Sequence, residues 1–486
     1  MRLTNSLQNR YILKLFATMV SAGLRMIILF IVPKSIGPEQ FGIYNYLTTM
    51  FSKYYGVLDA GTSTAFYVKL SQKNDDKKLI TFYHFVAIVI FFFTSIVFSL
   101  LNYFDAIHLV MPDIEVKYII DGIILSFLLW LATVQIKTMD AYSFTLVSEL
   151  IKIIYSIFSF ILFMIVAYFC NITLDIFFYY LIFSALLYNS LLFYKSYKII
   201  LWTYIIKLND IKYYIKDFYI YTHPLFFNMI ITTFVTMFDF WLLQKYGGLS
   251  EQGYYGLVFQ IAAMSSILTT SMTPLISREF SKDFKNKKIN RMRLVFKKYI
   301  PQFYVLASII AVFVSYNAEF FISVIAGEKF QSSVLLLTIM AFYPLHQTYG
   351  QLSGAVFFAT DKTKQYRNTS VFFMLVGIPL SYILLVYFSY GALGLVIKVL
   401  VIQFLSVNYQ LFLNSKYLKL NYIKLLLHQF YVPIVLWFIL NLCSNILDVE
   451  NSYFQLILNF LFYSSVIVSL YFIWRKNDFI QKIQYI

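Results

Sequence analysis

The stretch YILKLFATMVSAGLRMIILFIVPKSIGPEQFGIYNYLTTMFSKYYGVLDAGTST, residues 11–64, decides the fold of this chain. It contains two apolar runs, Tyr11–Val32 and Phe41–Thr62, separated by a short polar stretch rich in proline and glycine. A helix of about 20 apolar residues is long enough to cross the hydrocarbon core of a bilayer. We therefore predict two membrane-spanning helices joined by a short turn over residues 33–40.

Each of these two runs carries a full positive charge, Arg25 in the first and Lys53 in the second. A cation at the bilayer centre costs roughly 2.5–3.5 kcal/mol on insertion scales. At about 1.5 Å of rise per residue, Arg25 lies about 12 Å from the Pro33 end and Lys53 about 18 Å from Phe41. Snorkelling to the interface therefore suits Arg25 better than Lys53. The other two interpretations are pairing with Asp59 and a polar cavity that attracts an anion, and we favour the cavity.

Composition places the chain among polytopic membrane proteins. Its 486 residues are 60% hydrophobic and 13% charged, whereas a soluble domain is about 25% charged. The two cysteines, Cys170 and Cys443, have no metal-binding spacing. The first apolar run is long enough to span and is followed by no small-residue cleavage site, so we expect it to remain as a transmembrane helix.

Apolar runs of similar length continue along the whole chain and predict an all-α fold with about fourteen transmembrane helices. After the first two, the predicted spans are Leu79–Leu101, Ile114–Ile136, Leu146–Phe169, Ile176–Tyr194, Ile220–Leu243, Tyr254–Ile276, Ile300–Ile325, Val334–Ala359, Val371–Phe388, Ala392–Leu413, Leu425–Leu447 and Tyr453–Trp474.

The distribution of lysine and arginine predicts the orientation in the membrane. With the N-terminus in the cytoplasm, the inner segments carry 30 of the 39 basic residues and the outer segments carry 4. Both termini are then cytoplasmic, and the net charge of +16 is a positive-inside effect that gives no reason to expect nucleic acid. We interpret residues 277–298 as a basic cytoplasmic connector that contacts lipid headgroups. Residues 195–219 suggest an amphipathic helix lying in the interface.

A short repeat suggests how the helices are organised. The pattern Gly-x4-Gly-x-Tyr at residues 37–44 recurs at residues 248–255, which is 211 positions later and six predicted helices further on. An even number of helices gives a parallel repeat, with two lobes related by an axis along the membrane normal. The predicted divisions are an N-terminal lobe and linker at 1–219, a C-terminal lobe at 220–424, and two additional helices with a short tail at 425–486.

Further charged residues inside predicted spans are candidates for function. Lys398 either adds a third cation to the cavity or snorkels to the outer surface. Asp239 either pairs with Lys245 or gates the outer mouth. Asp59 either closes the inner mouth by pairing or caps a helix end. The histidines His84 and His346 are interpreted as packing residues, with a proton relay as the alternative.

The motifs of catalysis are missing from the sequence. It has no Gly-x4-Gly-Lys-[Ser/Thr] phosphate loop and no His-Glu-x-x-His zinc motif. The predicted outer loops are short, whereas a membrane glycosyltransferase or polymerase needs a large loop or a catalytic carboxylate. We therefore expect a protein that is not an enzyme and that has no metal and no cofactor.

Three stretches resemble the Wzx-type polysaccharide biosynthesis (O-antigen) flippases of the multidrug/oligosaccharidyl-lipid/polysaccharide (MOP) exporter superfamily. The first runs from Arg25 through IGPEQFGIY, residues 36–44, to LDAGTSTA, residues 58–65. The second is Asp239 followed by the repeated glycine pattern, and the third is FATDKTK, residues 358–364. Helix count and chain length are similar over nearly the whole sequence.

The resemblance implies a flippase that moves an undecaprenyl-pyrophosphate-linked oligosaccharide across the bacterial cytoplasmic membrane, for O-antigen, capsule or exopolysaccharide synthesis. It also implies a cationic central cavity, with Arg25 and Lys53 matching the basic residues of the first two helices. Alternating access, a coupling ion (H⁺ or Na⁺), a polymerase with export machinery and membrane lipids are the implied mechanism and partners. A lipid II-type flippase and a drug or cation antiporter of the same superfamily are the alternatives.

Overall fold

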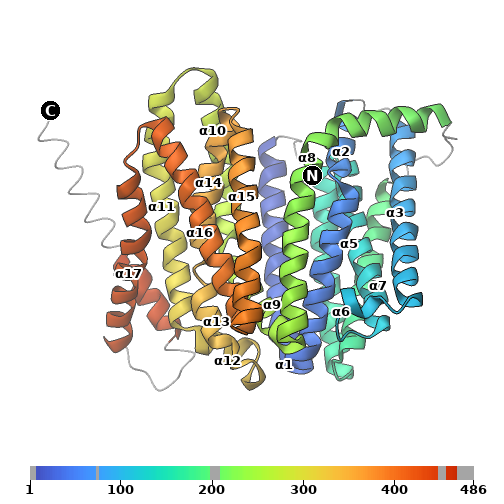
Figure 1. Ribbon diagram of the computed structural model, residues 1–486, viewed down its shortest axis with the longest axis horizontal. Helices are drawn as coiled ribbons and strands as arrows, with labels where there is room; N and C mark the ends of the chain where they lie inside the picture. Colours follow the sequence, from blue (N-terminus) through green and yellow to red (C-terminus); the bar gives the residue numbers. More distant parts are fainter. Residues whose placement is uncertain (1–6, 73–75, 197–207, 447–455, 468–486) are drawn as a thin grey trace, which may run out of the picture. The chain divides into compact units, whose positions relative to one another are not determined.

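In the computed structural model, the chain is an all-α polytopic membrane protein, as the sequence predicts (Figure 1). The structure describes residues 7–72, 76–196, 208–446 and 456–467. Within these ranges nine helices are long and apolar enough to cross a membrane. The predicted lobe divisions at residues 219 and 424 stay a prediction.

The two predicted N-terminal spans form one kinked helix, α1 (Leu7–Asp59). The expected turn over residues 33–40 is wrong in extent, because helix continues on both sides of Gly37, which alone has a non-helical backbone (φ 79°, ψ 175°). A positive φ is readily adopted by glycine. Pro38 follows directly, at the first position of the second arm, where its missing N–H does no harm. One glycine therefore makes the bend for which the sequence suggested a loop.

Helices occupy all the other predicted spans, although the last one, Tyr453–Trp474, is described only over Leu456–Ile467. Three predicted spans are each divided between two helices: α9 and α10, α11 and α12, and α13 and α14. The first half of the chain contains α2 (Thr62–Gln72), α3 (Lys77–Tyr103), α4 (Ile107–Val110), α5 (Val116–Ala141), α6 (Thr145–Phe169), α7 (Leu174–Ser196) and α8 (Leu208–Gly247).

The second half contains α9 (Leu249–Ser265), α10 (Ile267–Lys285), α11 (Ile289–Tyr316), α12 (Ala318–Ile325), the 3₁₀ turn η1 (Glu328–Phe330), α13 (Ser333–Met340), α14 (Tyr343–Ala359), α15 (Thr363–Tyr382), the π-helical turn η2 (Ile383–Tyr387), α16 (Gly391–Leu418) and α17 (Tyr422–Ile446). The π-helical turn comes four residues after Pro379, a residue that lacks the N–H needed to continue regular helical bonding.

The two copies of the glycine pattern contact each other reciprocally. A Cβ added to Gly42 would overlap with the carbonyl oxygen of Leu249, and a Cβ added to Gly253 would overlap with that of Pro38. Pro38 and Leu249 are themselves 211 positions apart, as are the two glycines. Small residues allow helix backbones to approach closely in membranes. The repeat found in the sequence is thus a two-sided backbone contact between α1 and α9.

The first part of α8 runs crosswise to the rest of that helix (Figure 1). It is fixed to the ends of α2 and α3 by the ion pairs Lys69–Asp217 (2.5 Å) and Lys78–Asp210 (3.1 Å). Tyr214 is buried with Phe66, Phe82 and Tyr83 in one hydrophobic cluster. This arrangement agrees with an amphipathic helix in the interface over residues 208–219, while residues 197–207 of that prediction lie outside the described part.

The chain forms two compact units, each assembled from several segments. The first comprises Met1–Leu257, Ile322–Ser332 and Met374–Lys398, and the second comprises Val258–Phe321, Ser333–Phe373 and Val399–Ile486. In the second unit, α10, α11, α14, α16 and α17 enclose a large apolar core. All five residues selected from the sequence as site candidates belong to the first unit.

Candidate functional site

Arg25 and Lys53 lie on the two arms of α1. Counted from the kink at Gly37, at about 1.5 Å per residue, Arg25 is about 18 Å away and Lys53 about 24 Å away. With Gly37 at one face of a hydrocarbon core of about 30 Å, as the predicted spans place it, we expect Arg25 near the middle and Lys53 nearer the opposite face. Arg25 is exposed and Lys53 half-buried. Among the residues that the structure describes, neither cation forms an ion pair.

Three tyrosines lie within the electrostatic field of Arg25. Its charge acts on the phenol groups of Tyr44, Tyr180 and Tyr188. Tyr44 is held by the ring of Phe177, with centroids 5.1 Å apart. A guanidinium group with five donors and no carboxylate partner can bind the oxygens of a phosphate in a bidentate manner. The chemistry of Arg25 is therefore compatible with binding an anion.

Asp59 ends α1 and caps the following helix, α2. One carboxylate oxygen accepts hydrogen bonds from the backbone N–H of Ser63 (3.0 Å) and the hydroxyl of Tyr83 (2.8 Å), and the other accepts one from Ser63 Oγ (2.7 Å). Lys137 Nζ donates to the same Ser63 Oγ at 2.7 Å. The carboxylate has no ion pair with Lys53 in the described part of the chain. This geometry is that of a carboxylate capping a helix end. The other role expected for Asp59, closure of the inner mouth, stays a prediction.

Replacing Asp59 by alanine is expected to lower the free energy of unfolding by about 1–2 kcal/mol, because it removes a helix cap. Denaturation of the purified protein in detergent measures this change. Glu115→Ala is the matched control, since Glu115 stands at the N-cap of α5 without a side-chain capping bond. Equal losses for the two variants would contradict the capping role.

The structure brings together Lys398 and Asp239, which were not predicted to pair with each other. Lys398 Nζ on α16 donates to Asp239 Oδ2 on α8, and both side chains are less than 10% exposed. Ser381 Oγ on α15 donates to the other carboxylate oxygen at 2.5 Å and also to the carbonyl of Gly377 at 3.0 Å. The expected partner Lys245 instead lies over the ring of Trp241, 4.7 Å from its centroid. Lys398 therefore serves a buried ion pair in this structure.

A polar seam between α6 and α7 was not predicted from the sequence. Its members are Tyr155 and Ser159 on α6, and Tyr180, Ser184 and Tyr188 on α7, which are joined by hydrogen bonds and one ring contact. The signal was available, because polar residues three or four apart share one face of a helix. It was overlooked because serine and tyrosine are common in this tyrosine-rich chain.

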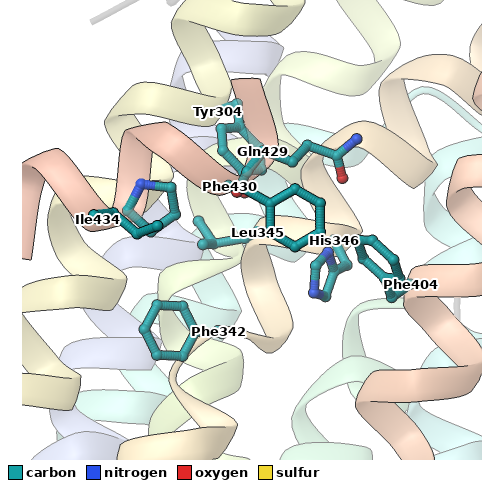
Figure 2. Close-up of a pocket in the computed structure, with 9 residues that line it drawn as sticks. Tyr304, Phe342, Leu345, His346, Phe404, Gln429, Phe430 and Ile434 are labelled. Atoms are coloured by element: carbon teal, nitrogen blue, oxygen red, sulfur yellow. The ribbon is translucent and has the colours of Figure 1, made fainter. Parts of the chain in front are cut away.

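The second unit contains an apolar pocket of about 320 Å³ between α11, α14, α16 and α17 (Figure 2). His346 points into it beside Phe404, with ring centroids 5.2 Å apart. His84, in the first unit, contacts the carbonyl of Ile80 through Nδ1 at 2.9 Å. That contact agrees with a packing role for His84. The other residues that line the pocket are Tyr304, Phe342, Leu345, Gln429, Phe430, Pro433 and Ile434.

The third stretch of resemblance, residues 358–364, joins α14 to α15. Lys362 in this connection lies over the ring of Tyr417 on α16, with Nζ 3.3 Å from the centroid. Partial burial lowers the pKa of Lys362 from its usual value. A cation over an aromatic face is a stabilising contact. In this structure, residues 358–364 therefore connect α14 to α15, and the contact of Lys362 with Tyr417 holds this connection against α16.

Solved transporter structures share this fold. Lipid II flippase MurJ in an inward closed conformation matches with a TM-score of 0.71 at 15% identity, over 94% of this chain and 98% of that chain. A multidrug resistance MATE family transporter of the MOP superfamily matches in its inward-facing conformation with a TM-score of 0.65 at 12% identity, over 84% of this chain and 98% of that one. The chain has the fold of MOP-superfamily transporters.

The outward-facing conformation of such a MATE family transporter matches the same fold with a TM-score of 0.56 at 13% identity, over 85% of this chain and 96% of that chain. No protein-family model matches the sequence, and no curated protein matches it either. At these identities the likeness concerns the fold, so the cargo has to be argued from the residues of this chain.

Proposed function

We propose that this protein is a flippase that moves an undecaprenyl-pyrophosphate-linked oligosaccharide from the inner to the outer leaflet of a bacterial cytoplasmic membrane. The observation that carries the proposal is that Arg25, which the predicted spans place near the middle of the bilayer, has no ion-pair partner among the described residues. A cation left uncompensated at that depth is costly. An anionic cargo that passes it repays that cost while it is bound.

The chemistry of the cargo fits the two cations on α1. A lipid-linked sugar pyrophosphate must carry its negative charge across about 30 Å of hydrocarbon. Arg25 offers bidentate contacts to the phosphate oxygens, and Lys53, about 6 Å nearer the inner end of the helix, acts as a point charge. The lipid tail stays in the bilayer while the charged headgroup passes Arg25 and Lys53. Alternating exposure to the two sides, between an N-terminal and a C-terminal lobe, then releases the cargo outward to a polymerase.

The proposal is tested by measuring leaflet accessibility in proteoliposomes that contain a short undecaprenyl-pyrophosphate oligosaccharide. We expect Arg25→Ala to slow flipping by about 10–100-fold, since a hydrogen bond to a charged group is worth about 1.5–3 kcal/mol. Lys53→Ala should slow it less. Lys34→Ala is the control, because Lys34 is an exposed cation on the same helix, beside the kink.

The same assay distinguishes two other possible cargoes, lipid II and small cations. The likeness to lipid II flippase MurJ makes lipid II the first alternative, and faster flipping of lipid II than of the oligosaccharide lipid would select it. Exchange of small cations with no movement of either lipid would overturn the flippase proposal in favour of an antiporter.

A further inference from the structure

Three polar side chains follow one face of α14 in the second unit. Gln347 Nε2 donates to Tyr343 OH at 2.9 Å, and Gln351 Nε2 donates to Gln347 Oε1 at 3.3 Å. From α10, Thr273 Oγ1 donates to Gln351 Oε1 at 3.3 Å. The three residues on α14 are four positions apart and therefore share one face of the helix. We call them the amide stripe, and it lies within the predicted span Val334–Ala359.

Holding helices together does not explain the amide stripe. Two of its hydrogen bonds run along α14 itself, and only the bond from Thr273 reaches another helix. Polar bonds that hold membrane helices together run across them. An example on α14 is Ser353, whose Oγ accepts from Asn414 Nδ2 on α16 at 2.6 Å, both residues being buried. The stripe is half-buried, and amides against hydrocarbon are costly, so we expect it to face water or a polar ligand.

The amide stripe has donors that the described residues do not use. A glutamine side chain has two N–H donors, and Gln347 and Gln351 each use one of them. The Tyr343 hydroxyl accepts from Gln347, and its own O–H has no acceptor in the described part of the chain. The Tyr343 ring lies 5.5 Å from that of Phe259 on α9, centroid to centroid. Each member of the stripe therefore offers one free donor, beside a pair of aromatic rings.

Another unpartnered amide, that of Gln403, lies on α16 at the level of the amide stripe. Gly350 lets the two helices approach, because a Cβ added there would lie 2.9 Å from Val407 on α16. Gln403 is one turn before Val407 on the same face, and its neighbour Phe404 lies beside His346 of α14 (Figure 2). Both polar atoms of the Gln403 amide are buried, and neither has a hydrogen-bond partner among the described residues. A ligand that reaches this amide supplies the missing bonds.

The chemistry of the amide stripe selects one part of a lipid-linked sugar. The helix α14 contains no Asp, Glu, Lys or Arg, so it offers a pyrophosphate no cation. A hydrocarbon tail gains nothing from free amide donors. Sugar hydroxyls both donate and accept hydrogen bonds, and small-ligand sites combine aromatic rings with a few amides and tyrosine hydroxyls. An uncharged sugar therefore fits these side chains.

We propose that the amide stripe, together with Gln403, binds an uncharged sugar of the lipid-linked oligosaccharide. This inference rests on the proposed function and adds to it the chemical class of the glycan and the residues that recognise it. The free N–H groups of Gln347 and Gln351 and the O–H of Tyr343 donate to sugar oxygens. The amide of Gln403 both donates to a sugar hydroxyl and accepts from one. No covalent bond is made or broken.

The first experiment measures the binding of two probes to the purified full-length protein. One probe is undecaprenyl pyrophosphate, and the other is the same lipid carrying a neutral trisaccharide, which the wild type should bind more tightly. Gln351→Met keeps the length of the side chain but removes the amide. It should weaken binding of the glycosylated probe about 5–10-fold, the effect of one lost hydrogen bond, and leave the bare lipid unaffected. Gln365→Met is the matched control, because Gln365 is an exposed glutamine on α15.

Two results of this experiment would overturn the inference and leave the flippase proposal standing. One is equal weakening of both probes by Gln351→Met, since the amide would then support the fold and not the sugar. The other is equal affinity of the wild type for the two probes. A third probe, with a trisaccharide of uronic acids, tests the charge of the glycan. Tighter binding of this probe than of the neutral one would overturn the assignment to an uncharged sugar.

A second experiment needs no lipid and separates failure of this inference from failure of the proposed function. Gln351→Cys is made in a Cys170→Ser background, where the remaining Cys443 is buried. A membrane-impermeant maleimide should label position 351, and the neutral trisaccharide should slow that labelling. Thr348→Cys, on the buried side of α14, should stay unlabelled. Protection by the trisaccharide supports the sugar site even if neither lipid binds. An unlabelled Gln351→Cys variant, or labelling that the trisaccharide leaves unchanged, overturns the site whatever the cargo is.

Discussion

Replacing Lys398 by methionine is expected to lower the free energy of unfolding by about 3–5 kcal/mol, because it leaves the Asp239 carboxylate buried without its cation. Both side chains are less than 10% exposed, and among the described residues Ser381 would be the partner left to the carboxylate. The loss is measured by denaturing the purified protein in mixed micelles. Asp239→Asn is expected to be similarly damaging, since it leaves a buried ammonium group.

A double variant that removes both charges tests whether Lys398 and Asp239 stabilise the protein as a pair. The double variant Lys398→Met/Asp239→Asn should be more stable than either single variant, because neither member of the pair is left as an unpaired buried charge. Lys245→Met is the control for loss of a cation near the C-terminal end of α8. If the two single effects simply add, the ion pair is not what stabilises this part of the structure. In the flipping assay the double variant should stay active if Lys398 has no contact with the cargo.

Gly42→Ala and Gly253→Ala are each expected to destabilise the protein by about 1–3 kcal/mol or more, the range for overpacking a tight interface. In both variants the new methyl group would overlap with a carbonyl oxygen of the opposite helix, and a backbone atom cannot rotate away as a flexible side chain can. The helices α1 and α9 would have to separate. Yield of folded protein and denaturation in detergent measure the effect.

Gly23→Ala provides the matched control for these substitutions. Gly23 lies on α1 as well, but nothing would lie within 4 Å of an added Cβ. Alanine is also the better helix former, so this variant should be neutral or slightly stabilising. Similar behaviour of Gly23→Ala and Gly42→Ala would show that helix propensity, and not the contact with α9, controls the outcome.

The sequence predicted the helices well because membrane burial imposes a simple rule. A run such as residues 79–101 has to be about 20 residues long and apolar, whatever it packs against, and α3 covers that run in full. Boundaries inside long apolar runs were less predictable. The break between α13 and α14, before Pro344, depends on local backbone geometry that hydropathy does not report.

The sequence identified individual charged residues inside the predicted spans, but it did not identify their partners. Lys398 and Asp239 are 159 residues apart, and no local spacing connects them. Asp59 is different, since the partner that defines its role, Ser63, is only four residues away.

The reciprocal contact of α1 and α9 has the geometry of a symmetric dimer, in which residue i contacts j and j contacts i. Near the axis of such a dimer a residue meets its own copy. Here Asn45 and Gly256 are equivalent positions, and a Cβ added to Gly256 would overlap with the Asn45 side chain. Two identical subunits would have to place the same residue at both positions, and two asparagines would not fit. A single chain with two separately encoded copies can keep asparagine on one side and glycine on the other.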